Sequence, residues 1–273
     1  MKLIDTHAHL EHSRFKKDLG RVIERFEKAG GELVINSGVN PETNRKALEI
    51  SRRYEVVKCS FGIYPIDALV KEVEEGVKRG NAFLRNIEEF DVDGELNWIE
   101  AHSDDCVAIG EIGLDYNWKE FQTEDLREKQ KRVFRKCLKL AKKIDKPVVI
   151  HSRKAEEDAI EILEKKEFGG LSVIMHCFNG KKSLIKRCVE NGWYFSVPPV
   201  IMRLEHFKML VRLVPLGQLL TETDAPYLSP VVGKKNESMN VGVTIREIAR
   251  IKGLDVKVVS EQIFKNALEL FNL

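Results

Sequence analysis

Short apolar runs rich in β-branched residues alternate along the chain with longer stretches in which apolar positions recur every three or four residues. The short runs predict strands and the longer stretches predict amphipathic helices. Eight strands are expected, at residues 3–6, 33–37, 56–61, 106–110, 147–150, 172–175, 193–197 and 216–221. Helices are expected at residues 19–29, 43–53, 126–144, 155–165, 183–191, 241–252 and 256–270.

This alternation predicts a parallel sheet, because parallel neighbours need a crossover connection, usually a helix. Eight repeats favour an α/β fold of the closed (β/α)8 TIM-barrel type, with an open doubly wound sheet as the alternative. The 273 residues are ordinary for one such barrel and contain no linker or low-complexity segment. A single domain over residues 1–273 is therefore expected. Residues 67–103 fit the pattern least well and predict one or two helices, broken near residues 91–94.

Composition narrows the class of protein only a little. The 45 basic and 43 acidic residues give a net charge of +2, which neither indicates nor excludes a nucleic-acid partner. The five cysteines are odd in number and form no CxxC pair, so free thiols in a reducing cytosol are expected. The first apolar run is too short for a signal peptide, and no run is long enough to span a membrane. We expect a cytoplasmic protein without a membrane partner, and a monomer.

Metal-ligand residue types stand at or just after the ends of five predicted strands. His7 and His9 follow the first strand at a spacing that aims two side chains to one face. The others, each after a separate apolar run, are Glu111, His151, His176 and Asp224. A single histidine in such a place is often only a satisfied core residue, but the carboxyl ends of barrel strands meet at one mouth, where active sites are built.

Four imidazoles and two carboxylates exceed the three protein ligands of a usual catalytic zinc site. They suit two divalent cations about 3.5–4 Å apart that share one carboxylate and activate water, a site whose natural chemistry is phosphoester hydrolysis. Such ligands accept Zn, Mn, Fe or Co, and Mg where carboxylates dominate. The sequence does not distinguish among these metals.

Five motifs, in order along the chain, resemble those of the TatD family of metal-dependent deoxyribonucleases. They are residues 5–10 (Asp-Thr-His-Ala-His-Leu), 110–116 (Gly-Glu-Ile-Gly-Leu-Asp-Tyr), 147–153 (Pro-Val-Val-Ile-His-Ser-Arg), 176–180 (His-Cys-Phe-Asn-Gly) and 221–228 (Thr-Glu-Thr-Asp-Ala-Pro-Tyr-Leu). The resemblance spans essentially the whole chain. It implies a TIM-barrel hydrolase that uses two divalent cations to cut DNA, often as an exonuclease.

The resemblance also implies roles for individual residues. His7, His9 and Asp224 would hold one metal, His151 and His176 the other, and Glu111 would bridge both. Asp224 would in addition orient or deprotonate the attacking water, so Asp224 and Glu111 are the expected catalytic residues. Asp115, Arg153 and Glu222 are expected behind the ligands or against the substrate. Arg153 suits a phosphate oxygen, although a salt bridge to a loop carboxylate is the alternative.

Two departures from the family pattern affect the substrate side of the site. Tyr64 stands where members commonly carry a histidine, and it can donate a hydrogen bond but cannot act as an imidazolium. In the loop 233–240, Ser238 replaces a proline, so the loop is expected to be less fixed. Lys234 and Lys235 of this loop are candidates for contact with a DNA backbone; the alternative is a solvated loop.

Two other functions remain open. A different hydrolase on the same scaffold would act on a lactone, an amide or a small phosphoester. Glu111, rather than a lysine, follows the fourth strand, which argues against the carboxylated-lysine bridge of many such relatives. A non-catalytic metal-dependent binding or scaffold protein is the third possibility, which the complete ligand set disfavours.

Overall fold

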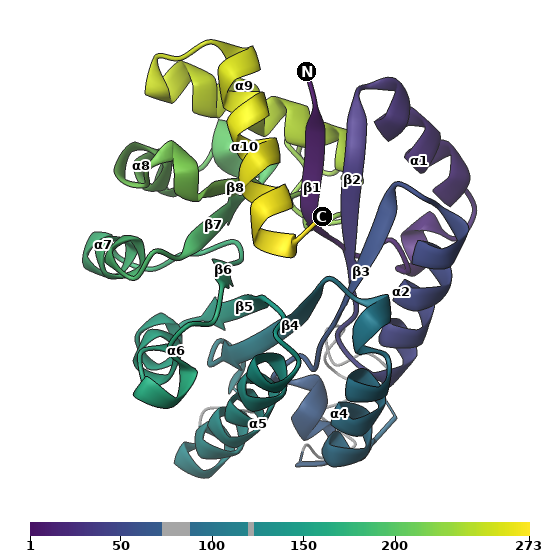
Figure 1. Cartoon of the computed structure of the whole chain (residues 1–273), viewed down its shortest axis with the longest axis vertical. Coiled ribbons are helices and arrows are strands. Elements are labelled where there is room, and N and C mark those ends of the chain that lie inside the picture. Colours follow the sequence, from purple (N-terminus) through teal and green to yellow (C-terminus); the bar gives the residue numbers. More distant parts are fainter. Residues whose placement is uncertain (73–87, 120–122) are drawn as a thin grey trace.

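The computed structural model describes residues 1–72, 88–119 and 123–273. Its centre is one sheet of eight parallel strands that pair in sequence order. The strands are β1 (Leu3–Ala8), β2 (Gly31–Ser37), β3 (Val57–Phe61), β4 (Ala108–Asp115), β5 (Val148–Arg153), β6 (Val173–Met175), β7 (Tyr194–Val197) and β8 (Leu219–Thr221). All eight predicted strands are confirmed, and the sheet curls into a ring (Figure 1).

The ring closes where β1 meets β8. The Thr6 hydroxyl donates to the carbonyl of Thr221 over 3.0 Å, and the Thr221 hydroxyl donates to the carbonyl of Ile4 over 2.6 Å. Just beyond β8, Ala225 forms a parallel bridge with Ala8. The fold is therefore the expected TIM barrel, and the open sheet is excluded.

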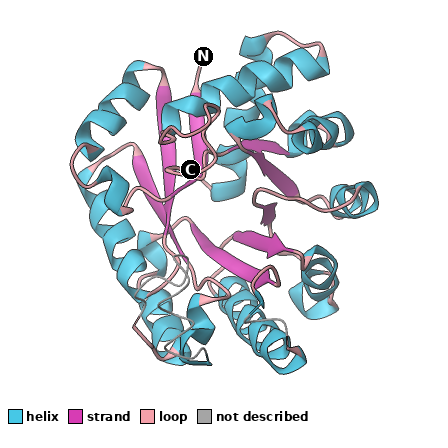
Figure 2. Cartoon of the chain, turned by 180° about the vertical axis from the view of Figure 1, so that it is seen from behind, coloured by secondary structure: helices cyan, strands magenta, loops and turns pink. Residues whose placement is uncertain are grey.

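Helices surround the strands on the outside (Figures 1 and 2). They are α1 (Leu19–Lys28), α2 (Pro41–Arg53), α4 (Val92–Ala101), α5 (Glu124–Lys143), α6 (Glu156–Leu163), α7 (Lys182–Glu190), α8 (Glu205–Leu213), α9 (Val241–Lys252) and α10 (Val256–Phe271). Each carries an apolar stripe toward the sheet; in α1, for example, Val22, Ile23 and Phe26 are buried. No helix in the described ranges is both long and apolar enough to cross a bilayer.

Three features differ from the sequence-based expectation. Helix α8 was not predicted, although Phe207, Leu210 and Val211 are buried at helical spacing. In the segment 67–103, a 3-10 helix covers Asp67–Glu72 and α4 begins at Val92. The part of this expected helical segment at residues 73–87 lies outside the described residues. Strands β1, β4 and β5 extend past their predicted ends, so that some expected site residues lie inside strands rather than after them.

Strands β1 and β4 are irregular around two of the predicted metal ligands. Between Asp5 and Ala8, β1 uses one residue more than β2, and β4 uses one more than β5 between Ile109 and Ile112. Such bulges re-aim side chains that a regular strand would point elsewhere. His7 and Glu111 lie within these two irregular stretches.

Candidate active site

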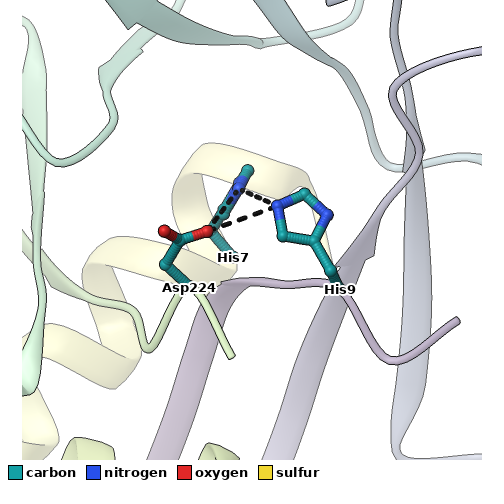
Figure 3. A group of neighbouring side chains, drawn as sticks. All are labelled: His7, His9 and Asp224. Atoms are coloured by element: carbon teal, nitrogen blue, oxygen red, sulfur yellow. Dashed lines mark hydrogen bonds and ion pairs between the residues drawn. The ribbon is translucent and has the colours of Figure 1, made fainter. Parts of the chain in front are cut away.

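The six predicted ligands meet at the carboxyl end of the barrel. His7 lies inside β1 and His9 just beyond it, Glu111 lies inside β4, and His151 lies inside β5. His176 directly follows β6, and Asp224 lies three residues past β8 with a φ of 53°. That left-handed backbone is uncommon for a non-glycine residue and turns the carboxylate toward the histidines of β1 (Figure 3).

One group of donors joins β1 to the loop after β8. The Nε2 atoms of His7 and His9 lie 3.2 Å apart, and the Oδ1 atom of Asp224 lies 3.8 and 3.3 Å from them. Figure 3 shows both rings turned toward this carboxylate oxygen. These three ligand atoms lie within 4.8 Å of one another, a spacing that allows them to share one metal ion.

Glu111 stands between the histidines of β1 and those that follow. Its Oε2 atom lies 3.5 Å from His7 Nε2 and 3.7 Å from His9 Nε2. Its other oxygen, Oε1, lies 2.8 Å from His151 Nδ1 and 3.8 Å from His176 Nε2. Ligand atoms of His7, Glu111 and His176 form a second close group. The carboxylate therefore faces both pairs of imidazoles, one oxygen to each.

Each imidazole has an outer partner that leaves its other nitrogen facing inward. His7 Nδ1 lies 3.0 Å from the Ser37 hydroxyl, and His9 Nδ1 donates to the carbonyl of the same serine over 3.0 Å. His176 Nδ1 donates to Glu222 Oε2 over 2.6 Å. His151 uses its two nitrogens the other way round: Nε2 contacts the outer partner, Asp115, and Nδ1 faces inward to Glu111. Outer partners of this kind fix the ring orientation of metal-binding histidines.

Carboxylate neighbours raise the pKa of three of the four histidines, whereas burial lowers the pKa of His7. Burial alone would lower the pKa of His151 and of His176, but their carboxylate neighbours raise it to about 10 and about 9. Burial would likewise raise the pKa of Glu111, yet hydrogen bonds from His151 and His7 hold it well below its usual value. The pKa of Asp224 is lowered too, against its burial, through its hydrogen bond with His9.

A cavity of about 380 Å³ opens above the donors. Its wall includes His9, Glu111, His151, His176 and Asp224, together with Val39, Tyr64, Asp67, Ser152, Arg153, Cys177, Asn179, Tyr227 and Leu228. Arg153 is exposed there, with its guanidinium 5.8 Å from the centre of the Trp118 ring. No described carboxylate pairs with Arg153, so the alternative of a salt bridge finds no support within those residues.

Most of the other residues expected to contact the substrate already contact other groups of the protein. Tyr64 lines the cavity, but its hydroxyl donates to Asp115 Oδ2 over 2.8 Å. Asp115 and Glu222 are fully buried behind His151 and His176 rather than exposed to a substrate. Lys235 pairs with Asp18 over 2.8 Å, whereas Lys234 is exposed in the loop before α9.

Sequence reasoning missed several residues that support the site. Ser37 ends β2 and orients both His7 and His9, and it carries the same signal as the others, a polar residue at a strand end. Asp5, buried beneath His7, accepts from the backbone nitrogen and the hydroxyl of Thr223 over 2.8 and 2.6 Å. Burial raises the pKa of Asp5 to about 7, partly offset by its hydrogen bond with Thr223. Trp118 and Gln130, which contact Asp115, carried no such signal.

The donor set fits divalent cations, since nitrogen and carboxylate oxygen atoms converge there from five strands and every imidazole is oriented from behind. A TIM barrel with this set at its carboxyl end defines a metal-dependent hydrolase.

The family model described as "TatD related DNase" matches residues 4–272, so the chain belongs to the TatD family. It is 34% identical over 271 residues to the human protein named deoxyribonuclease TATDN3, covering 98% of this chain and 94% of that one. It is 32% identical over 271 residues to an uncharacterized metal-dependent hydrolase of Methanocaldococcus jannaschii, covering 99% and 97%. Among solved structures, YJJV, a TatD homolog from Escherichia coli, matches with a TM-score of 0.82 at 24% identity, covering 99% of this chain and 98% of the other. That last likeness supports the fold.

Proposed function

We propose that this protein hydrolyses phosphodiester bonds of DNA, from a strand end, with two divalent cations. The observation that carries the proposal is Glu111, which presents one carboxylate oxygen to His7 and His9 and the other to His151 and His176. A carboxylate whose two oxygens face different pairs of histidines suits a ligand that bridges two metal ions. The name of the human relative, deoxyribonuclease TATDN3, supports this substrate.

In this proposal, His7, His9 and Asp224 hold one cation, while His151 and His176 hold the other. Bound there, two divalent cations would polarise the phosphoryl group and stabilise the charge that develops on the leaving oxygen. Zn, Mn and Mg all remain candidates, because the ligand set is mixed.

Two side chains of the chain act directly on the reactants. Arg153, exposed at the cavity wall, binds a non-bridging phosphate oxygen and holds the phosphorus in line for attack. Asp224 has one oxygen beside the histidines and a second that points away from them (Figure 3). That second oxygen accepts the proton of the attacking water.

The cavity supports action at an end of the strand. At about 380 Å³ it falls near the lower limit of the roughly 300–1,000 Å³ typical of small-ligand sites, which suits a terminal nucleotide better than continuous duplex. Few base contacts are expected, because phosphate contacts carry little sequence information.

The same cavity size favours one second candidate, a hydrolase of small esters or lactones. Lys235, one of the two lysines expected to contact DNA, is already paired with Asp18, which agrees with this candidate. The two functions differ in the substrate and not in the ligand set.

The test uses end-labelled single- and double-stranded DNA and metal-stripped protein resupplied with Mg, Mn or Zn. A metal-dependent ladder of shortened products is expected from the wild type and from the control Glu55→Ala, an exposed glutamate, and none from Glu111→Ala. Aryl esters, lactones and small phosphodiesters are assayed in parallel. Intact DNA under every metal, with turnover of a small ester, would refute the nuclease and establish the second candidate.

A further inference from the structure

Tyr64 extends from the loop after β3 into the wall of the cavity. Its backbone nitrogen donates to the carbonyl of Val39 over 2.8 Å, which anchors the loop to the segment before α2. Its ring meets the His151 ring edge-on, with centroids 4.8 Å apart. Tyr64 therefore contacts the predicted metal ligand His151 and also lines the cavity.

The Tyr64 hydroxyl is committed to the protein. It donates to Asp115 Oδ2 over 2.8 Å and lies 3.3 Å from His151 Nε2. The same carboxylate oxygen lies 3.2 Å from Trp118 Nε1 and 3.2 Å from His151 Nε2. Three donors therefore converge on one oxygen of a side chain that is fully buried.

The rest of Asp115 is also fixed. Its other oxygen accepts from the backbone nitrogen of Asn117 over 2.8 Å. The side-chain amide of Gln130, from α5, accepts from the backbone nitrogen of Asp115 over 2.8 Å and donates to its carbonyl over 3.0 Å. The carboxylate cannot rotate without breaking several of these contacts.

We propose that Tyr64 is a positioning residue, which together with Trp118 fixes Asp115 so that the carboxylate accepts from His151 Nε2 and His151 keeps Nδ1 free toward Glu111. This inference rests on the proposed function, because it concerns the cation that His151 would hold. A histidine whose Nε2 carries the proton has its lone pair on Nδ1, the nitrogen 2.8 Å from Glu111.

The same geometry argues against Tyr64 as the donor to a substrate phosphate. A hydroxyl has one proton, and that proton is given to Asp115; a phosphodiester offers only acceptors. Arg153 remains as the positively charged side chain that can bind the phosphate, because no carboxylate among the described residues pairs with it. The two roles predict different kinetic effects.

The experiment compares Tyr64→Phe with Tyr116→Phe, a matched control that also removes one tyrosine-to-carboxylate hydrogen bond, the 2.9 Å contact with Asp158. The affinities of both cation sites are measured without substrate, by titration of metal-stripped protein with Co²⁺ against a competing chelator and by the Co²⁺ absorption spectrum. For Tyr64→Phe we expect one of the two ions to bind about 10–100-fold more weakly, the other unchanged, and the control to match the wild type. At subsaturating metal, kcat should fall while KM for DNA stays constant.

Trp118→Phe removes the second donor and should weaken the same ion, which keeps the inference testable if Tyr64→Phe folds poorly. An unchanged Co²⁺ affinity with a raised KM would show that Tyr64 contacts the substrate and would overturn the inference. Unchanged affinity and unchanged kinetics would overturn it as well, leaving Tyr64 a packing residue. A wild-type protein that binds fewer than two ions would instead refute the proposed function, and this result is seen before any variant is made.

Discussion

Gly62, at the end of β3, packs directly against the backbone of Glu111. A Cβ atom at position 62 would lie 2.3 Å from the nitrogen of Glu111 and 2.4 Å from its carbonyl oxygen. Ordinary contact begins near 3.4 Å, so Gly62→Ala would force the two backbones apart by about 1 Å. Gly62 cannot easily retreat, because Asn44 binds both its nitrogen and its carbonyl, over 3.1 and 3.0 Å.

The expected cost has two parts. Overpacking of this kind destabilises a fold by roughly 1–3 kcal/mol. A displacement of about 1 Å in the residue that faces both pairs of histidines should lower kcat/KM by on the order of 10²-fold, because catalysis depends steeply on position. Denaturant unfolding reports the first effect, and hydrolysis at saturating metal reports the second.

Gly217→Ala is the matched control. Apart from its two chain neighbours, no heavy atom of the described residues lies within 4 Å of a Cβ placed there, and its backbone is not left-handed. This variant should keep wild-type stability and activity. If Gly62→Ala also kept both, the close approach of Gly62 to the backbone of Glu111 would be wrong, and with it the placement of the carboxylate that we propose as the bridge.

Three further predictions concern the surroundings of the ligands. Glu222→Gln should weaken metal binding about 10–100-fold, because an amide can donate to His176 Nδ1 and favour the wrong tautomer; unchanged metal content after dialysis would contradict this. Arg153→Ala should raise KM for DNA, lower kcat because the phosphorus is no longer held in line, and reduce the salt slope of binding by roughly 0.7–0.9, whereas an unchanged slope would remove Arg153 from the phosphate. In metal-stripped protein the pKa of His151 is about 10 and that of His176 about 9, both raised. Their contribution to stability is therefore complete below about pH 6.5 and is lost as the pH rises through 9 to 10; a melting temperature that does not fall over this range would refute the assignment.

The barrel and the ligand types could be predicted from the sequence because both follow from local pattern. Parallel strands buried on both faces appear as apolar runs, and polar residues at their carboxyl ends must meet once the ring closes. His7, Glu111 and His176 were found in this way, although their distances were not. The unpredicted α8 had a usable signal in the spacing of Phe207 and Leu210, which was obscured by the apolar residues around it.

The bulges in β1 and β4 could not be predicted, because a bulge depends on the register with the neighbouring strand. A regular alternation would end the fourth strand before Glu111, whereas the structure carries β4 on to Asp115. Glu111 consequently lies inside the sheet, which makes its position more rigid than a loop residue's would be.

Contacts between residues that are far apart in the sequence could not be predicted either. Lys235 and Asp18 are far apart in sequence, yet they form an ion pair. This pair involves a lysine that the sequence suggests as a contact for DNA. The hydroxyl of Tyr64 likewise meets Asp115 only through the fold. Residue type indicates what a side chain can do, whereas the tertiary contacts decide whether it is available.

We propose that six side chains at one end of the barrel hold two divalent cations. Anomalous diffraction from crystals grown with Mn²⁺, recorded above and below the Mn absorption edge, tests it most directly. Two peaks are expected, one beside His7, His9 and Asp224 and one beside His151 and His176, with Glu111 between them. A single peak, or peaks away from Glu111, would contradict it.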